Sequence, residues 1–88
     1  MISRATPKFW QLLHALPPSI QTLAEKNYRL WREDPHHASL RFRRLQGSQE
    51  RYTVRIGDHY RALATVKGGV ITWVWIGTHE EYNRLVKA

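Results

Sequence analysis

Residues 52–63 read YTVRIGDHYRAL, two alternating segments joined by a Gly-Asp turn at 57–58. Aromatic and aliphatic side chains fall at every second position, beginning at Tyr52 and again at Tyr60. Successive side chains of a β-strand point to opposite faces, so this period of two predicts two strands. A short turn rich in glycine and aspartate between such segments is typical of an antiparallel hairpin. We therefore predict a hairpin with one apolar face and one basic face.

The same period of two extends to both sides of this hairpin. Upstream, apolar residues and arginines alternate over residues 39–43, and residues 46–49 (QGSQ) are typical of a turn. Downstream, Lys67-Gly68-Gly69 is a tight hairpin signal. Residues 70–76 are apolar on both faces, as in a central or doubly covered strand. These segments predict four consecutive antiparallel strands.

Prolines mark two helices in the first third of the chain. Thr6 and Pro7 are typical of a helix start, since threonine caps the first turn and proline fits it. Pro17-Pro18 ends this helix and begins the next. Asp34-Pro35 stops the second helix, because the residue before a proline is pushed out of the α region. Apolar residues recur at helical spacing between these limits, which predicts a helical hairpin.

The order of these elements predicts an α+β fold. An N-terminal helical hairpin is expected to pack on one face of a four-stranded antiparallel, curled sheet. Residues 79–86 are expected to form a short helical tail. The chain has 88 residues, of which 42% are hydrophobic and 24% charged, as in one globular domain spanning residues 1–88.

Basic residues outnumber acidic residues by two to one. Fourteen lysines and arginines face seven acidic residues, and the formal net charge is +7. Ten of the fourteen are arginines, whose planar charged fork suits phosphate. Three interpretations are open: a solvated basic surface, an acidic protein partner, or nucleic acid. For so small a chain, an acidic partner or nucleic acid is favoured.

The sequence contains no cysteine, which excludes disulfides and thiolate metal sites. No apolar run has the length of a membrane span, and residues 1–10 lack the pattern of a signal peptide. We therefore expect a cytoplasmic protein with no membrane partner. No pair of histidines has zinc-ligand spacing, so we expect neither a metal nor another cofactor.

Six arginines fall in the first three predicted strands and their turns. Alternation places Arg41 and Arg43 on one face, and Arg51 and Arg55 on one face of the next strand. Like charges on adjacent strands destabilise a sheet unless a phosphate backbone or an acidic protein segment offsets them. The alternative is charge scattered at solvated edges, where it deters aggregation. The six are Arg41, Arg43, Arg44, Arg51, Arg55 and Arg61.

His79 and Tyr82 follow the last predicted strand. Histidine is the usual general acid or base near neutral pH, and strand ends hold reacting groups on rigid supports. Together with arginines that stabilise added charge, the pair fits metal-free cleavage of RNA by its own 2′-hydroxyl. The pattern alone favours the alternative that His79 caps a turn and Tyr82 packs on the core. Trp73 and Trp75, predicted on one face of the last strand, fit base stacking, a partner's helix or the core.

The segment YTVRIGDHYRAL at residues 52–63 resembles the hairpin of RelE/ParE-superfamily toxins, where a Tyr-x-Val-Arg strand precedes a turn and a Tyr-Arg pair. The LQG at residues 45–47 is similar to the Leu-x-Gly before it. The IGTH at residues 76–79, followed by Tyr82, is similar to the Gly-x-(His/Arg) ending of the last strand. The likeness extends over residues 8–85. Three departures are Thr53, where the best-known nuclease has lysine, Tyr82, which follows His79 more closely than that enzyme's tyrosine follows its arginine, and an N-terminal strand limited to residues 1–4.

This resemblance implies the toxin of a type II toxin–antitoxin pair, neutralised by an acidic antitoxin protein on its basic surface. RelE-like members cut mRNA in the ribosomal A site without metal, whereas ParE-like members inhibit DNA gyrase and cut nothing. The nuclease is our leading hypothesis, and the alternatives are a gyrase inhibitor and a non-catalytic antitoxin-binding module.

For the nuclease, the resemblance places Arg61 on the scissile phosphate and Arg55 in charge stabilisation. It makes His79 the general acid or base, with Tyr82 as a further catalytic candidate. The remaining arginines are expected to bind the backbone of mRNA or ribosomal RNA. These are Arg41, Arg43, Arg44 and Arg51.

Overall fold

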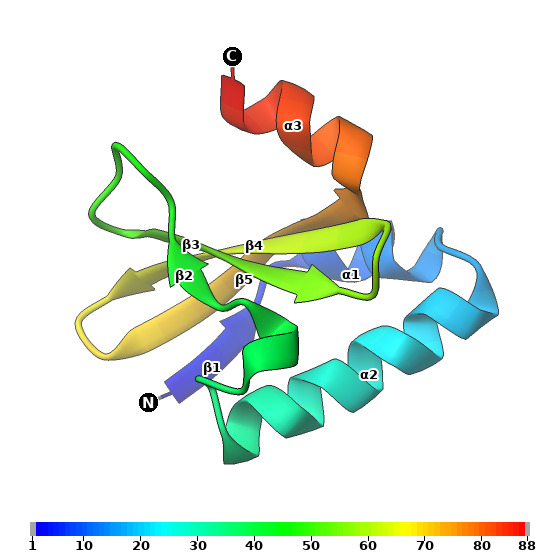
Figure 1. The fold of residues 1–88 in the computed structure, drawn as a ribbon, viewed down its shortest axis with the longest axis horizontal. Helices are drawn as coiled ribbons and strands as arrows, with labels where there is room; N and C mark the ends of the chain where they lie inside the picture. The colour runs from blue at the N-terminus through cyan, green and yellow to red at the C-terminus, as the bar shows by residue number, and fades with distance from the viewer. Residues whose placement is uncertain (1, 88) are drawn as a thin grey trace.

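Five strands form one mixed sheet in the computed structural model, which describes residues 2–87 (Figure 1). Their order across the sheet is β1-β5-β4-β3-β2; β1 runs parallel to β5, and all other neighbours are antiparallel. The α+β class is confirmed, with one more strand than predicted. The strands are β1 Ile2–Ala5, β2 Arg43–Arg44, β3 Arg51–Ile56, β4 Tyr60–Lys67 and β5 Val70–Thr78.

Strand β1 adds to the predicted antiparallel sheet a parallel pair at one edge. It extends one residue past the predicted limit of 1–4, while Met1 lies outside the described residues. The strand pairs with β5 from Ile2 opposite Val70 to Ala5 opposite Trp73. Its side chains are alternately exposed and half-buried, so only a weak apolar alternation marks it in the sequence. The central position predicted for β5, which lies between β1 and β4, is confirmed.

The predicted hairpin of β3 and β4 is confirmed. Ile56 pairs with Tyr60 at the turn, where Gly57 adopts a positive φ of 62°. The next hairpin, between β4 and β5, closes through Gly68 and Gly69 with φ values of 57° and 77°. Positive φ at both loop residues gives a turn whose twist matches that of the strands it joins.

The prediction that Trp73 and Trp75 share one face of β5 is wrong. A register shift lies between Leu63 and Ala64 on β4, where Leu63 pairs with Trp75 and Ala64 with Trp73. Consecutive residues of β4 point to opposite faces, so their two tryptophan partners also lie on opposite faces. Trp73 faces the helices and meets Trp31 edge to face, with ring centroids 5.3 Å apart.

Three α-helices flank the sheet within residues 2–87: α1 Pro7–His14, α2 Pro18–Glu33 and α3 His79–Lys87. The predicted cap of α1 is confirmed, since the Phe9 amide donates to Thr6 Oγ1 at 3.1 Å. The predicted ends of α2 are also confirmed, with Pro18 first and Asp34 as the C-terminal cap. Figure 1 shows α3 leading away from the end of β5, with α2 on the other side of the sheet in this view.

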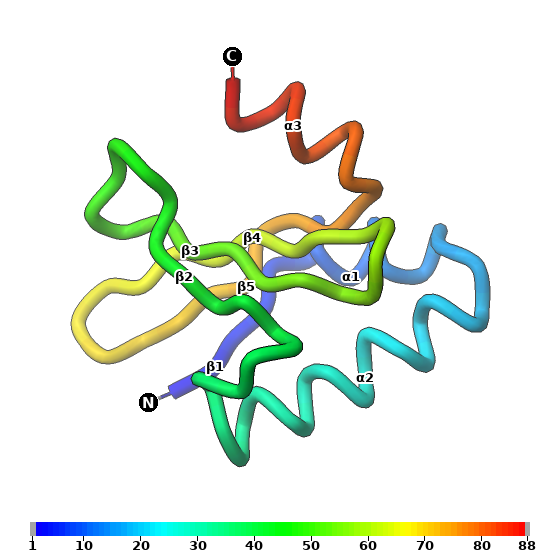
Figure 2. Tube along the Cα trace, viewed as in Figure 1, coloured from blue at the N-terminus to red at the C-terminus, as the bar shows by residue number. Residues whose placement is uncertain are grey.

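The predicted strand over residues 39–43 is wrong in most of its length. A 3₁₀ turn, η1, occupies Ala38–Leu40, and the strand β2 is limited to Arg43–Arg44. The turn forms because the Ser39 amide donates to His37 Nδ1 at 3.3 Å, and Leu40 is completely buried beneath it. Figure 2 shows this segment folded back on the path that leads into β2.

The core lies between the helices and the sheet. Aliphatic side chains from η1 and β5 are its most buried members, and Trp31 of α2 joins the cluster through Trp73 and Phe42. The largest fully buried side chains are Leu40, Ile71 and Ile76. None of the helices in residues 2–87 has the length and apolarity needed to cross a bilayer.

Candidate functional site

A groove of about 370 Å³ lies where β2, β3, β4 and the start of α3 meet. The fold brings into it all four predicted catalytic residues and three of the four arginines predicted to bind RNA. The fourth, Arg51, is not one of its lining residues and pairs with Thr65 at the start of β3. We call this feature the basic groove. Its lining residues are Arg41, Arg43, Arg44, Leu45, Gln46, Thr53, Arg55, Arg61, His79 and Tyr82.

Arg55 and Arg61 face each other directly across β3 and β4. The hairpin turn supplies most of their partners: Arg55 Nε donates to the Gly57 carbonyl at 3.0 Å and its guanidinium pairs with Asp58. Arg61 Nη1 donates to the Tyr60 carbonyl at 2.7 Å and to the Gly57 carbonyl at 3.4 Å. Carbonyl oxygens at and beside the turn thus bind both guanidinium groups, and both arginines line the groove.

Arg61 lies in a strongly positive environment. Burial lowers the pKa of its guanidinium most, and the positive charges of Arg55 and then Arg41 lower it further. Tyr82 and Asp58 act in the opposite direction on the same pKa. An arginine stays charged at neutral pH even so, and its charge is therefore poorly compensated within the groove. An anion that enters here gains from this uncompensated charge.

Arg41 reaches the groove through an unusual backbone conformation. It follows η1 with φ 47° and ψ 44°, the left-handed region that non-glycine residues seldom adopt. Arg41 and Arg43 were predicted to share one face of a strand, and this is wrong for Arg41, which belongs to no strand. The left-handed turn brings its side chain to the same groove nevertheless.

His79 and Tyr82 enter the groove from the first turn of α3. Their rings stack at 6.1 Å with an interplanar angle of 14°. The His79 amide donates to the His59 carbonyl at 2.8 Å, which joins α3 to the turn between β3 and β4. The spacing of three residues places both rings on one side of the helix.

Thr53 lies under the arginines of the groove, opposite Arg43 of β2. Its side chain is 7% exposed, and its Oγ1 atom is buried without a hydrogen-bond partner. A buried hydroxyl without a partner is uncommon in folded proteins. Among residues 2–87, no cluster of three or more histidine, aspartate or glutamate side chains is placed to hold a metal ion.

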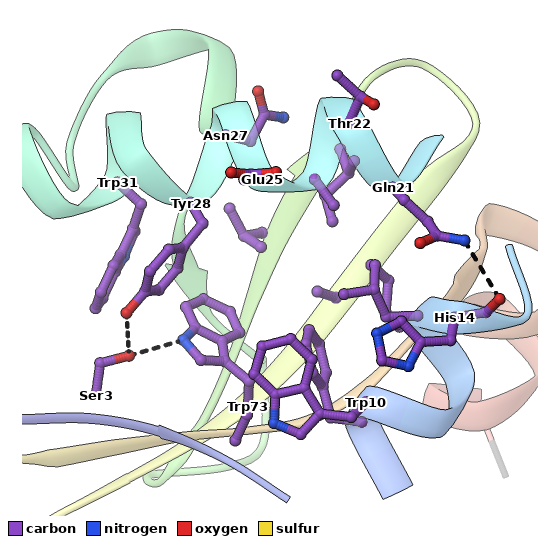
Figure 3. A pocket seen from close by; sticks show the side chains of 18 of the residues that line it. Ser3, Trp10, His14, Gln21, Thr22, Glu25, Asn27, Tyr28, Trp31 and Trp73 are labelled. Atoms are coloured by element: carbon purple, nitrogen blue, oxygen red, sulfur yellow. Dashed lines mark hydrogen bonds between the residues drawn. The ribbon is translucent and has the colours of Figure 1, made fainter. Parts of the chain in front are cut away.

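A second, apolar cavity of about 710 Å³ lies between α1, α2 and the sheet (Figure 3). The sequence interpretation missed it, because the same aromatic stripe predicts a filled core. In the wall of this cavity, Ser3 Oγ accepts hydrogen bonds from Tyr28 Oη at 3.0 Å and from Trp73 Nε1 at 3.3 Å. In Figure 3, Trp73 and Trp10 lie between Tyr28 on one side and His14 on the other, and all four line the cavity.

Comparison with known proteins identifies one family that this sequence matches and several solved structures that share its fold. The family of ParE-like toxin domains matches residues 18–84. No match was found among curated proteins.

Several solved toxin structures share the fold. A chain of the RelB-RelE antitoxin-toxin complex from Methanococcus jannaschii aligns with a TM-score of 0.75 and 16% identity, over 93% of this chain and 96% of that one. The isolated E. coli RelE toxin aligns at 0.67 and 17%, over 98% and 95% of the two chains. The YoeB/ParE toxin from Agrobacterium tumefaciens aligns at 0.69 and 15%, over 90% and 99%.

Proposed function

Because this chain belongs to the family of ParE-like toxin domains, we propose that it is the toxin of a type II toxin–antitoxin pair and cleaves mRNA on the ribosome without a metal. The site of action is the cytoplasm, where its substrate is translated. One observation carries the proposal: Arg55, Arg61, His79 and Tyr82, which the resemblance to RelE-like nucleases selects, line one groove.

The chemistry of the groove supports a phosphodiester substrate. Five arginines line it, and Asp58 is paired with one of them, so a polyanion finds positive charge that is not yet neutralised. The backbone of RNA supplies regularly spaced phosphates and releases bound counterions as the arginines replace them. Arg41, Arg43 and Arg44 also line the groove and would bind the flanking phosphates.

The proposed reaction uses the hydroxyl that distinguishes RNA from DNA. The 2′-oxygen attacks the adjacent phosphorus, the bond to the 5′-oxygen breaks, and a 2′,3′-cyclic phosphate forms. Arg61 and Arg55 would stabilise the charge that develops on the phosphoryl oxygens. His79 donates a proton to the departing 5′-oxygen, and the proton of the attacking hydroxyl passes to water. Tyr82 stacks on the imidazole and would limit its orientation.

The natural partner in this proposal is an acidic antitoxin. Related folds have been solved as RelB-RelE complexes from Methanococcus jannaschii, Pyrococcus horikoshii and E. coli. The formal net charge of +7 favours an acidic partner over a neutral one. An antitoxin segment whose carboxylates lie against the basic groove would exclude RNA by occupying the same arginines.

A toxicity and RNA assay tests the proposal. The chain is expressed under tight control and new mRNA 5′ ends are mapped by primer extension, beside Arg61→Ala and His79→Ala. We expect growth arrest with new ends that both substitutions abolish. Lys67→Ala is the matched control, because it removes a positive charge from an exposed hairpin position outside the groove. Cleavage by His79→Ala at the parent rate would overturn the assignment.

Inhibition of DNA gyrase is the second candidate, and two observations favour it. The matching family is described as ParE-like, and Thr53 occupies the position where the best-known nuclease has lysine. Under this alternative the same expression experiment gives filamentous cells and DNA damage while mRNA stays intact. The two outcomes exclude each other as the primary activity.

A further inference from the structure

The first turn of α3 is closed by reciprocal hydrogen bonds between Thr78 and Glu81. Glu81 Oε1 accepts from the Thr78 amide at 3.0 Å and from Thr78 Oγ1 at 2.9 Å. The Glu81 amide in turn donates to Thr78 Oγ1 at 3.2 Å. This arrangement is a capping box, in which the side chains at both ends of the first turn satisfy each other's backbone amides.

The capping box matters because α3 contacts β4 and β5 but contributes no fully buried side chain to the core. The helix extends over His79–Lys87, nine residues, and none of them is buried. A helix this short is marginal in water without tertiary contacts or caps. The direction of its first turn therefore depends on the bonds at its start, which are the capping box and the bond from the His79 amide to the His59 carbonyl.

Two residues of the basic groove lie on this turn. His79 is the residue directly after Thr78, and Tyr82 directly follows Glu81. Gly77 makes room for the arrangement, since a Cβ atom there would lie 3.1 Å from Glu81 Oε1 and 2.6 Å from the Trp75 ring. The carboxylate of Glu81 therefore lies beside the end of β5, where the chain passes from the strand into α3.

We propose that Glu81, acting through Thr78, is a positioning residue that holds His79 and Tyr82 against the basic groove. The inference rests on the proposed nuclease function for its effect on rate. The structural part of the inference does not rest on that function, because it concerns the arrangement of side chains in the free protein. The two hydrogen bonds from Thr78 lower the pKa of Glu81, so the carboxylate that maintains the box is the form present at neutral pH.

The test compares Glu81→Ala with Glu81→Gln and Glu80→Ala in ribosome-dependent cleavage of mRNA. Glu81→Ala should lower kcat by about 10- to 100-fold with little change in KM, because misplaced reacting groups slow the chemical step. Glu81→Gln should stay within about threefold of the parent, since glutamine also forms a capping box. Glu80→Ala should resemble the parent, because this exposed neighbour carries the same charge but no bond to Thr78.

Three results would overturn the inference. Parent-like kcat in Glu81→Ala would show that the box does not matter for the reaction. An equal loss in Glu80→Ala would assign the effect to charge alone. A loss in Glu81→Gln as large as in Glu81→Ala would exclude the hydrogen-bond geometry as the cause.

Thr78→Ala, which keeps the backbone amide but removes the hydroxyl, is the second variant. Its kcat should fall between those of Glu81→Gln and Glu81→Ala.

A readout without substrate separates this inference from the proposed function. Nuclear Overhauser contacts between the His79 and Tyr82 rings report the stack in the free protein. We expect them in the parent and in Glu80→Ala, and we expect their loss in Glu81→Ala. If the parent cleaves no mRNA but this pattern holds, the nuclease proposal fails and the positioning role stands. If the contacts persist in Glu81→Ala, the positioning role fails whatever the activity.

Discussion

Arg55 on β3 and Arg61 on β4 are direct cross-strand partners, one pair away from the turn that joins the two strands, so two positively charged side chains share this part of the basic groove. Like charges in this arrangement destabilise a sheet. Asp58 pairs with Arg55, but its side chain is 76% exposed and offsets little of the repulsion. The fold therefore carries a local electrostatic cost at the place where an anionic partner would remove it.

Salt should stabilise this protein. We expect the free energy of unfolding to rise by about 0.5 to 1 kcal/mol between about 0.05 M and 0.5 M NaCl, since screening weakens the repulsion within the groove. Urea denaturation at the two salt concentrations measures this change in the free energy of unfolding. Arg61→Gln should show a smaller response, whereas Lys67→Gln, outside the groove, should keep it. A free energy that falls with salt in the parent would contradict this account.

The buried hydroxyl of Thr53 should be dispensable for stability. Valine has the same shape and removes an oxygen that lacks a hydrogen-bond partner. We therefore expect Thr53→Val to leave the free energy of unfolding unchanged or to raise it by up to about 1 kcal/mol. Thr78→Val is the opposite case, because the hydroxyl of Thr78 accepts from the Glu81 amide, and it should destabilise α3. Clear destabilisation by Thr53→Val would show that this hydroxyl has a partner in solution.

Glu81 should titrate below the ordinary pKa of a glutamate, because the Thr78 amide and hydroxyl donate to its carboxylate. A lowered pKa in the folded state contributes stability above the unfolded pKa, and this contribution is lost as the pH falls through the folded value. The capping box should therefore open only in acid. Titration of the side-chain carboxyl by NMR measures this, and Thr78→Ala should move the pKa part of the way back up, because it removes the hydroxyl but keeps the amide. An identical titration in that variant would show that the hydroxyl of Thr78 does not lower the pKa.

Two glycines with positive φ should respond differently to alanine. Gly57 and Gly68 have φ values of 62° and 57°, so each substitution should cost about 1 kcal/mol from backbone strain. At Gly57, the new Cβ would also lie 2.9 Å from Leu23 Cδ2, whereas nothing lies within 4 Å at Gly68. Gly57→Ala should therefore lower the free energy of unfolding by about a further 1 kcal/mol. Equal losses in thermal or urea unfolding would show that Leu23 moves aside freely.

Local signals predicted the elements that depend on neighbours in sequence. Thr6 and the prolines set the limits of α1 and α2, and alternation with glycine turns set β3, β4 and β5. These signals act within a few residues, through capping bonds, restricted φ and the side-chain period. They failed over residues 39–43, where the start of the alternating segment forms a 3₁₀ turn that buries Leu40 instead of a strand.

The sequence predicted the types of residue that line the basic groove, but not which individual residues line it. Alternation placed Arg55 with Arg51 on one face, yet only Arg55 lines the groove, because Arg51 lies at the far end of β3. The left-handed backbone at Arg41 and the register shift that separates Trp73 from Trp75 leave no local signature. Both depend on contacts with strands or turns distant in the sequence.

By itself, the sequence determined the α+β class, the basic charge and the chemistry that His79, Tyr82 and the arginines make available, since these follow from residue type and short-range periodicity. Only the tertiary structure decided that β1 joins β5, that the helices leave an apolar cavity above the sheet, and that the start of α3 lies beside the turn between β3 and β4 and lines the groove. These features arise from packing between segments far apart in the chain, where the energy of each contact depends on the whole fold.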